Sequence, residues 1–334
     1  MSYKTYKMTI KAKSTFITPI QSDTLFGQMI WAIKYTQNDE MVEKIIQETK
    51  DGNPPFVFSN PIVDDEYPLF GKLTEKYFEE VDKHFSNKIE AADFKKRNKR
   101  RSFVSSEVFQ ELIEGKKIED IYIEILNKKR DFTTLKKTNQ NMNILSKENL
   151  KLQTTSTKYS FRERNSINRL NIDSDDDNSR LFSQDEINYN GDVVLFINIH
   201  SEFNIKIFEK AFQYIQYNGY GKKASSGKGQ FEVLRMEPYN EFNNESKYNK
   251  FIVLSNFLPN EKDDISVIEG KTFTKKSKSY GDNPHKNYFI AYREGSYFTG
   301  DSNKIKGRVL ENINPKDPKV IQNLIPFCVG VKDE

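Results

Sequence analysis

Hydrophobic and polar positions alternate at the start of the chain and then change to a helical period. Residues 4–12 (KTYKMTIKA) alternate, which predicts a half-buried β-strand. Residues 22–35 (SDTLFGQMIWAIKY) carry the apolar stripe of an amphipathic helix, with Ser22 or Asp23 as the expected N-cap. The stripe consists of Leu25, Phe26, Met29, Ile30 and Ile33. The segment 54–63 (PPFVFSNPIV) indicates a short strand between prolines, near a sheet edge.

A second strand–helix–strand succession follows much later in the chain. Residues 192–200 (DVVLFINIH) are almost continuously apolar, which is typical of a central strand buried on both faces. An amphipathic helix is expected at 205–217, a glycine-rich loop at 219–230 (GYGKKASSGKGQ) and a strand at 230–236. The two successions predict an α+β, ferredoxin-like domain with a four-stranded antiparallel sheet and two helices on one face.

The long segment 64–190 interrupts this order and is interpreted as an insertion that carries hairpins and mobile loops. It contains one expected helix near 73–85 and a basic run at 95–101 (KKRNKRR). Weak alternation at 119–126 (EDIYIEIL) is typical of a strand, and the stretch 130–160 is polar.

After about residue 245 the pattern predicts strands and little helix. The strand-like segments are FIVLSNF (251–257), NYFIAYREG (287–295) and IPFCVGV (325–331). We therefore expect an N-terminal domain over 1–240 and a second, β-rich domain over 241–334.

Composition narrows the class of protein. The chain has 334 residues, of which 36% are hydrophobic and 13% aromatic, enough for a substantial core. The formal net charge is only +4, so a nucleic-acid surface would need local clustering of cations. A single cysteine, Cys328, excludes a disulfide framework and a cysteine-based zinc site. Without a signal-type apolar run or a stretch of about 20 apolar residues, we expect a cytoplasmic protein.

The sequence offers few side chains suited to acid–base catalysis. The three histidines, His84, His200 and His285, have no metal-ligand spacing and no sequence-near catalytic partner. The acidic run 173–177 lacks the spacing and the glycine of an EF-hand, which favours a solvated turn. No histidine is therefore marked as a catalytic base by its sequence neighbours, and we expect no metal and no cofactor.

The glycine-rich loop is the first candidate site. A phosphate loop of the Walker type is excluded, because five residues separate Gly221 from Gly227 and Lys228 is followed by another glycine. Glycines at such positions let a phosphodiester chain approach backbone N–H groups. The alternative is a mobile surface connection with solvated lysines. The candidate RNA-binding residues are Gly219, Gly221, Lys222, Lys223, Ser225, Ser226, Gly227, Lys228 and Gly229.

Three further segments could contact nucleic acid. The start of the first helix offers Ser22 and Thr24 beside free helix N–H groups, or these residues simply cap the helix. The basic run ends in an aromatic residue, which suits single-stranded nucleic acid, whereas the alternative is a solvated charge run. Its candidates are Lys96, Arg97, Arg100 and Arg101. The segment 161–170 (FRERNSINRL) adds Arg162, Arg164 and Arg169, which can grip phosphate or stack on bases.

Several of these segments resemble motifs of the RAMP superfamily of CRISPR-associated RNA-binding proteins. GYGKKASSGKGQFEV is similar to the family's glycine-rich loop, and SDTLFGQMIWAI to its first helix. NSINRLNIDSDDDNSRLFSQDEI resembles a third motif, although Asn168 stands where aspartate is usual and the Thr-Gly pair is missing. YREGSYF and PFCVGV resemble a second, degenerate RAMP domain.

The resemblance implies a role in a type III-A CRISPR (Csm) effector complex. Subunits of this kind do not cut RNA. They hold the 5′ handle of the CRISPR RNA (crRNA) and join the large palm-domain subunit to the backbone RAMP subunits. The alternative within the family is an endoribonuclease that cleaves with the help of a histidine, but none of the three histidines lies in the expected first helix or beside the glycine-rich loop.

Overall fold

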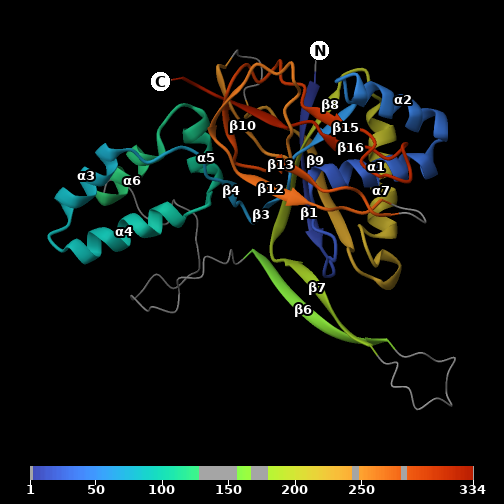
Figure 1. Cartoon of the computed structure of the whole chain (residues 1–334), viewed down its shortest axis with the longest axis horizontal. Coiled ribbons are helices and arrows are strands. Elements are labelled where there is room, and N and C mark those ends of the chain that lie inside the picture. The colour runs from blue at the N-terminus through green and yellow to red at the C-terminus, as the bar shows by residue number, and fades with distance from the viewer. Residues whose placement is uncertain (1–2, 128–155, 167–179, 243–247, 280–283, 334) are drawn as a thin grey trace.

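The computed structural model shows a mixed α+β fold (Figure 1). It describes residues 3–127, 156–166, 180–242, 248–279 and 284–333. Within these residues, no helix is long and apolar enough to cross a membrane.

An antiparallel sheet forms the centre of the N-terminal part. Its strands are β1 (Tyr3–Ala12), β2 (Phe56–Phe58), β3 (Ile62–Val63), β8 (Asp192–His200) and β9 (Phe231–Pro238). The order is β2-β8-β1-β9, and β3 also pairs with β8. The strands predicted at 4–12, 192–200 and 230–236 are therefore confirmed. The segment 54–63 forms two short strands instead of one.

Alternate residues of β8 enter two different hydrophobic cores. Leu195 and Ile197 pack in a cluster with residues of α1 (Ser22–Thr36) and α7 (Ile205–Asn218). Phe196 enters the other cluster, on the opposite face of the sheet. Both predicted helices thus pack on one face of the sheet. A further helix, α2 (Asp39–Lys50), follows α1 and was not predicted.

The first part of the insertion is helical, so the expectation of hairpins and loops is wrong there. It contains α3 (Glu75–His84), α4 (Lys88–Arg100), α5 (Ser106–Ile113) and α6 (Ile118–Leu126). The short strand β4 (Tyr67–Pro68) precedes α3 and pairs with β5 (Phe103–Val104), which lies between α4 and α5. The helix expected near 73–85 is confirmed as α3. The expected strand at 119–126 is instead α6, because Ile118, Ile121 and Ile125 are buried at helical spacing. Most of the polar stretch 130–160 lies outside the described residues.

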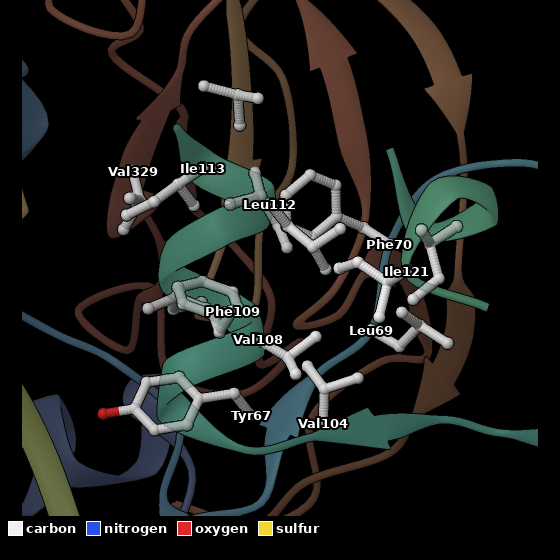
Figure 2. Packing of buried hydrophobic residues seen from close by; sticks show 14 of the residues in the cluster. Tyr67, Leu69, Phe70, Val104, Val108, Phe109, Leu112, Ile113, Ile121 and Val329 are labelled. Carbon is white, nitrogen blue, oxygen red and sulfur yellow. The ribbon is translucent and has the colours of Figure 1, made fainter. Parts of the chain in front are cut away.

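Helix α5 connects the insertion to the C-terminal strands. Its residues Val108, Phe109, Leu112 and Ile113 are buried against Tyr67, Leu69, Phe70 and Val329 (Figure 2). This cluster contains residues from both sides of position 240, so one core serves both parts of the chain. The boundary between 1–240 and 241–334 stays a prediction.

The described residues in the rest of the insertion form a hairpin of β6 (Thr157–Ser166) and β7 (Arg180–Tyr189). It projects from the body of the molecule in Figure 1. At its base, Phe16 and Ile187 exchange backbone hydrogen bonds of 2.8 and 2.7 Å. The segment that follows β1 therefore fixes the base of the hairpin.

The C-terminal part is β-rich, as predicted. A four-stranded sheet has the order β11 (Ser266–Glu269), β14 (Tyr297–Thr299), β10 (Lys250–Val253) and β17 (Cys328–Val331). Two smaller pairs are β12 (Thr272–Lys275) with β13 (Phe289–Tyr292), and β15 (Arg308–Leu310) with β16 (Gln322–Leu324).

Candidate nucleic-acid interface

The loop between α7 and β9 has a fixed backbone built on glycines. Gly219, Gly221, Gly227 and Gly229 all have positive φ, between +68° and +84°. A Cβ at Gly229 would lie 2.0 Å from the carbonyl oxygen of Tyr220, so only glycine fits there. Lys223 is also left-handed, at φ 66°, and begins a short 3₁₀ turn, η2 (Ala224–Ser226).

Hydrogen bonds tie this loop to the segment between β1 and α1. Gly229 donates its N–H to the carbonyl of Thr15 over 2.9 Å, and Lys222 donates to the hydroxyl of Thr18 over 2.9 Å. The hydroxyl of Tyr220 donates to the carbonyl of Pro19 over 3.1 Å. These contacts argue against a mobile connection, the alternative that the sequence left open.

The outer surface of the loop carries the predicted chemistry. Lys222, Lys223, Ser225 and Ser226 are exposed, and so is Gly227. The hydroxyl of Ser226 donates to the carbonyl of Lys223 over 3.0 Å. The two ammonium groups and the hydroxyl of Ser225, on a glycine-rich backbone, form a suitable surface for phosphate groups.

Lys228 points into the protein instead. Its ammonium lies 2.8 Å from Oε1 of Glu186 and 2.5 Å from the hydroxyl of Thr15, and its side chain is only 13% exposed. The structure therefore does not place Lys228 on the outer surface beside Lys222 and Lys223, and its predicted contact with RNA stays a prediction. The ammonium is used for contacts within the chain.

Glu186, on β7, gathers cations from the hairpin and the loop. It is 1% exposed, and the hydroxyl of Thr15 donates to its Oε2 over 2.9 Å. Arg162 and Arg164 approach the same carboxylate to 3.4 and 3.8 Å. Burial alone would raise the pKa of Glu186, but the hydrogen bonds and positive charges of these neighbours outweigh burial and lower it. Sequence reasoning missed Glu186 and Thr15.

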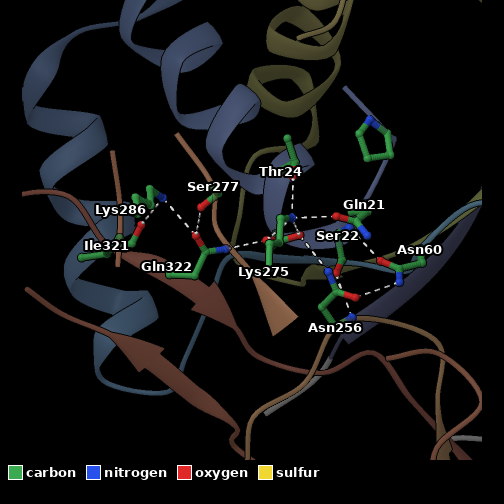
Figure 3. Close-up of polar contacts among 12 residues, drawn as sticks. Gln21, Ser22, Thr24, Asn60, Asn256, Lys275, Ser277, Lys286, Ile321 and Gln322 are labelled. Carbon is green, nitrogen blue, oxygen red and sulfur yellow. Dashed lines mark hydrogen bonds and ion pairs between the residues drawn. The ribbon is translucent and has the colours of Figure 1, made fainter. Parts of the chain in front are cut away.

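The start of α1 is enclosed by the C-terminal part of the chain (Figure 3). Ser22 is buried, its N–H donates to Asn60, and its hydroxyl accepts from the N–H of Asn256. Thr24 lies 3.2 Å from the ammonium of Lys275. This polar packing uses the groups that were predicted to bind an anion. The N-cap is Gln21 rather than Ser22 or Asp23.

The basic run lies on the C-terminal half of α4, far from the loop in Figure 1. Lys96, Arg97 and Arg100 are exposed. Arg101 is partly buried beside Tyr122, and burial lowers its pKa while Tyr122 opposes that shift. The structure therefore does not bring this run together with the loop. Arg101 also differs from Lys96, Arg97 and Arg100 in being partly buried.

The remaining sequence candidates fall elsewhere. Arg169 and the acidic run 173–177 lie outside the described residues. His200 ends β8 and packs edge-on against Tyr3, with 5.3 Å between ring centroids. His84 ends α3, and His285 forms an isolated bridge with Lys278. Among the described residues, no three His, Cys, Asp or Glu side chains are grouped as metal ligands.

No protein-family model and no curated protein matches this chain. Solved structures, however, share its fold. A chain of a Csm1–Csm4 cassette in complex with pppApA has a TM-score of 0.53 at 15% identity and matches over 99% of both chains. A chain of a Csm3–Csm4 subcomplex of the type III-A CRISPR-Cas interference complex has a TM-score of 0.51 at 16% identity. That match covers 98% of this chain and 99% of the other. The likeness establishes the fold along almost the whole chain.

Proposed function

We propose that this chain is a Csm4-like, non-catalytic RNA-binding subunit of a type III-A CRISPR interference complex. Csm4 is the component common to both complexes whose chains share the fold, and each match spans nearly the full length. The RAMP-type motifs of the sequence support the same subunit. We further propose that both parts of the chain are RAMP domains of ferredoxin-like ancestry, the second degenerate. The strand order β2-β8-β1-β9, with α1 and α7 on one face, supports this for the first.

The ligand of this subunit would be the 5′ handle of the crRNA. One observation carries this proposal: the rigid loop exposes Lys222 and Lys223 and is joined through Glu186 to the hairpin that carries Arg162 and Arg164. A single RNA strand lying between loop and hairpin would meet four cations from two elements. Phosphate contacts of this kind fix position and register.

The partners would be a large palm-domain subunit and a backbone RAMP subunit. The neighbours support this, because their complexes pair Csm4 with Csm1 in one case and with Csm3 in the other. By forming both contacts, the chain would bridge the two kinds of subunit. Sequence specificity towards a target would come from guide–target pairing and not from this chain.

Salt-dependent RNA binding tests the proposal. The double variant Lys222→Ala/Lys223→Ala should weaken binding of a labelled RNA with the handle sequence, and the slope of log K against log salt should fall by roughly 0.7 per lysine. A matched variant, Lys262→Ala/Lys304→Ala, removes two exposed lysines from the C-terminal part. Equal slopes for the wild type and both variants would remove the loop from the RNA interface.

The alternative function, a crRNA-processing endoribonuclease, is tested with the histidines. We expect the triple variant of His84, His200 and His285 to alanine to retain any RNA cleavage that copurifies with the complex. Loss of cleavage with intact assembly would favour the nuclease.

A further inference from the structure

Three segments that are distant in the sequence meet at one buried carboxylate. Residues 13–16 follow β1, Glu186 lies on β7, and Lys228 belongs to the glycine-rich loop. Lys228 contacts Glu186 directly over 2.8 Å, and Thr15 contacts both. The hydroxyl of Thr15 donates to Glu186 over 2.9 Å and lies 2.5 Å from the ammonium of Lys228, while its carbonyl accepts the N–H of Gly229 over 2.9 Å. The loop and the hairpin are therefore cross-linked through a single junction.

The cations around Glu186 are held unequally. Lys228 is 13% exposed and lies 2.8 Å from the carboxylate. Arg162 and Arg164 are 65% and 36% exposed and lie 3.4 and 3.8 Å away, beyond the usual length of a charge-assisted hydrogen bond. Lys228 thus forms the tight, enclosed pair, and the two guanidinium groups keep access to solvent.

The charges do not balance at this junction. One carboxylate faces three cations, so a net positive charge remains at the surface where the hairpin meets the loop. A phosphodiester group could bind the two arginines without displacing Lys228, because the arginines offer exposed donors and the lysine does not.

We propose that Glu186 and Lys228 are positioning residues, which lock the glycine-rich loop to the β6–β7 hairpin so that the exposed cations of both grip one RNA strand in a fixed geometry. This inference rests on the proposed RNA-binding function and deepens it. Glu186 is an acidic residue beside an RNA surface, and simple electrostatics would make it an antagonist of binding. The junction gives it the opposite role, because a preorganised site loses less entropy on binding.

The test compares Glu186→Gln, Lys228→Met and the double variant, in the full-length chain, with a short fluorescein-labelled single-stranded RNA. Glu186→Gln should weaken binding roughly three- to tenfold although it removes a negative charge. Lys228→Met should weaken binding similarly and leave the salt slope unchanged. The double variant should bind RNA no more weakly than the single variant with the lower affinity, because both changes break the same connection. Lys228→Arg, which keeps the charge, should bind as the wild type does.

Two RNA results would overturn the proposal. One is equal or tighter binding by Glu186→Gln, since a purely electrostatic or purely structural role gives that outcome. The other is a fall of about 0.7 in the salt slope of Lys228→Met, which is expected if this lysine contacts phosphate directly.

A second measurement needs no RNA and separates this inference from the proposed function. Native-state hydrogen exchange should accelerate together at the amides of Ile187 and Gly229 in Glu186→Gln, because one junction holds both segments. Unchanged exchange at both amides would overturn the cross-link, even for a chain that binds no RNA. Failure of the wild type to bind RNA, with exchange coupled as expected, would instead contradict the proposed function alone.

Discussion

The ammonium of Lys275 lies 2.7 Å from the carboxylate of Asp23, although 252 positions separate the two residues. Asp23 is in the first turn of α1, and Lys275 ends β12. Asn256 and Gln322 also donate to this carboxylate, over 2.9 and 2.5 Å. A buried polar network from the C-terminal part therefore holds the first helix, and the two parts of the chain are joined by specific contacts as well as by apolar packing.

Breaking this pair should cost much more stability than breaking an exposed one. Lys275→Met leaves Asp23 as a 1% exposed carboxylate without its counter-ion, and we expect the free energy of unfolding to fall by about 3–5 kcal/mol. Lys304→Met breaks an ion pair with Asp301 in which the lysine is 80% exposed, and it should cost less than about 1 kcal/mol. Urea unfolding measures both, and similar losses would contradict the role given to the buried pair.

Lys286 should give the protein a stability that rises at alkaline pH. Burial lowers the pKa of this lysine to about 8, Asp23 opposes the shift and Lys275 adds to it. In the unfolded chain the pKa is near 10.5, so the unfolded state binds more protons between about pH 8 and 10.5. The energetic penalty of burying this lysine is therefore complete below pH 8 and is relieved as the pH rises through that window.

Comparison with Lys286→Met isolates this effect, because the other titrating groups cancel. The free energy of unfolding of the wild type minus that of the variant should be flat below about pH 8 and then increase by roughly 1–3 kcal/mol towards pH 10.5. Urea unfolding at several pH values measures the difference. A difference that stays constant, or that falls with pH, would show that Lys286 titrates normally in the folded state.

Local periodicity was sufficient for the elements of the central sheet and insufficient for the contacts that build the site. The strand at 4–12 and the helix at 205–217 have clear apolar periods, and both are present. The segment IEDIYIEIL fits either period, because its isoleucines are spaced for a strand and for a helix, and tertiary packing decides for α6. Glu186 and Lys228 lie 171 and 213 positions after Thr15 in the sequence, and no local pattern marks a contact among such distant residues.

The arginines of the basic run should differ in how much they affect the stability of the fold. Arg101 is partly buried beside Tyr122, whereas Arg100 is exposed on α4. We expect Arg101→Met to change the free energy of unfolding by at least about 1 kcal/mol, since it replaces a partly buried guanidinium whose Nε has no hydrogen-bond partner among the described residues. Arg100→Met should change it by less than about 0.5 kcal/mol. Chemical denaturation measures both values. An unchanged free energy of unfolding in Arg101→Met would show that Arg101 behaves as an exposed residue, as Arg100 does.

Two glycines of the loop offer a matched pair in which only the surroundings differ. Gly227 and Gly229 have similar φ values, +79° and +68°, so alanine is strained at both by about 1–2 kcal/mol. A Cβ at Gly227 meets nothing within 4 Å, whereas at Gly229 it would lie 2.0 Å from the backbone oxygen of Tyr220. Gly229→Ala must therefore displace the backbone, and its cost should reach about 3–5 kcal/mol.

The RNA affinity of the same two variants should follow their stability. Gly229→Ala disrupts the close approach of Gly229 to the backbone of Tyr220 and the hydrogen bond from Gly229 to Thr15. It should therefore lower both the melting temperature and the affinity for RNA. Gly227→Ala should lower the melting temperature by only a few degrees. Thermal unfolding and RNA titration of the two variants check this. Equal melting temperatures would mean that the loop tolerates a Cβ at Gly229, and hence that its backbone is not fixed in the way the contacts indicate.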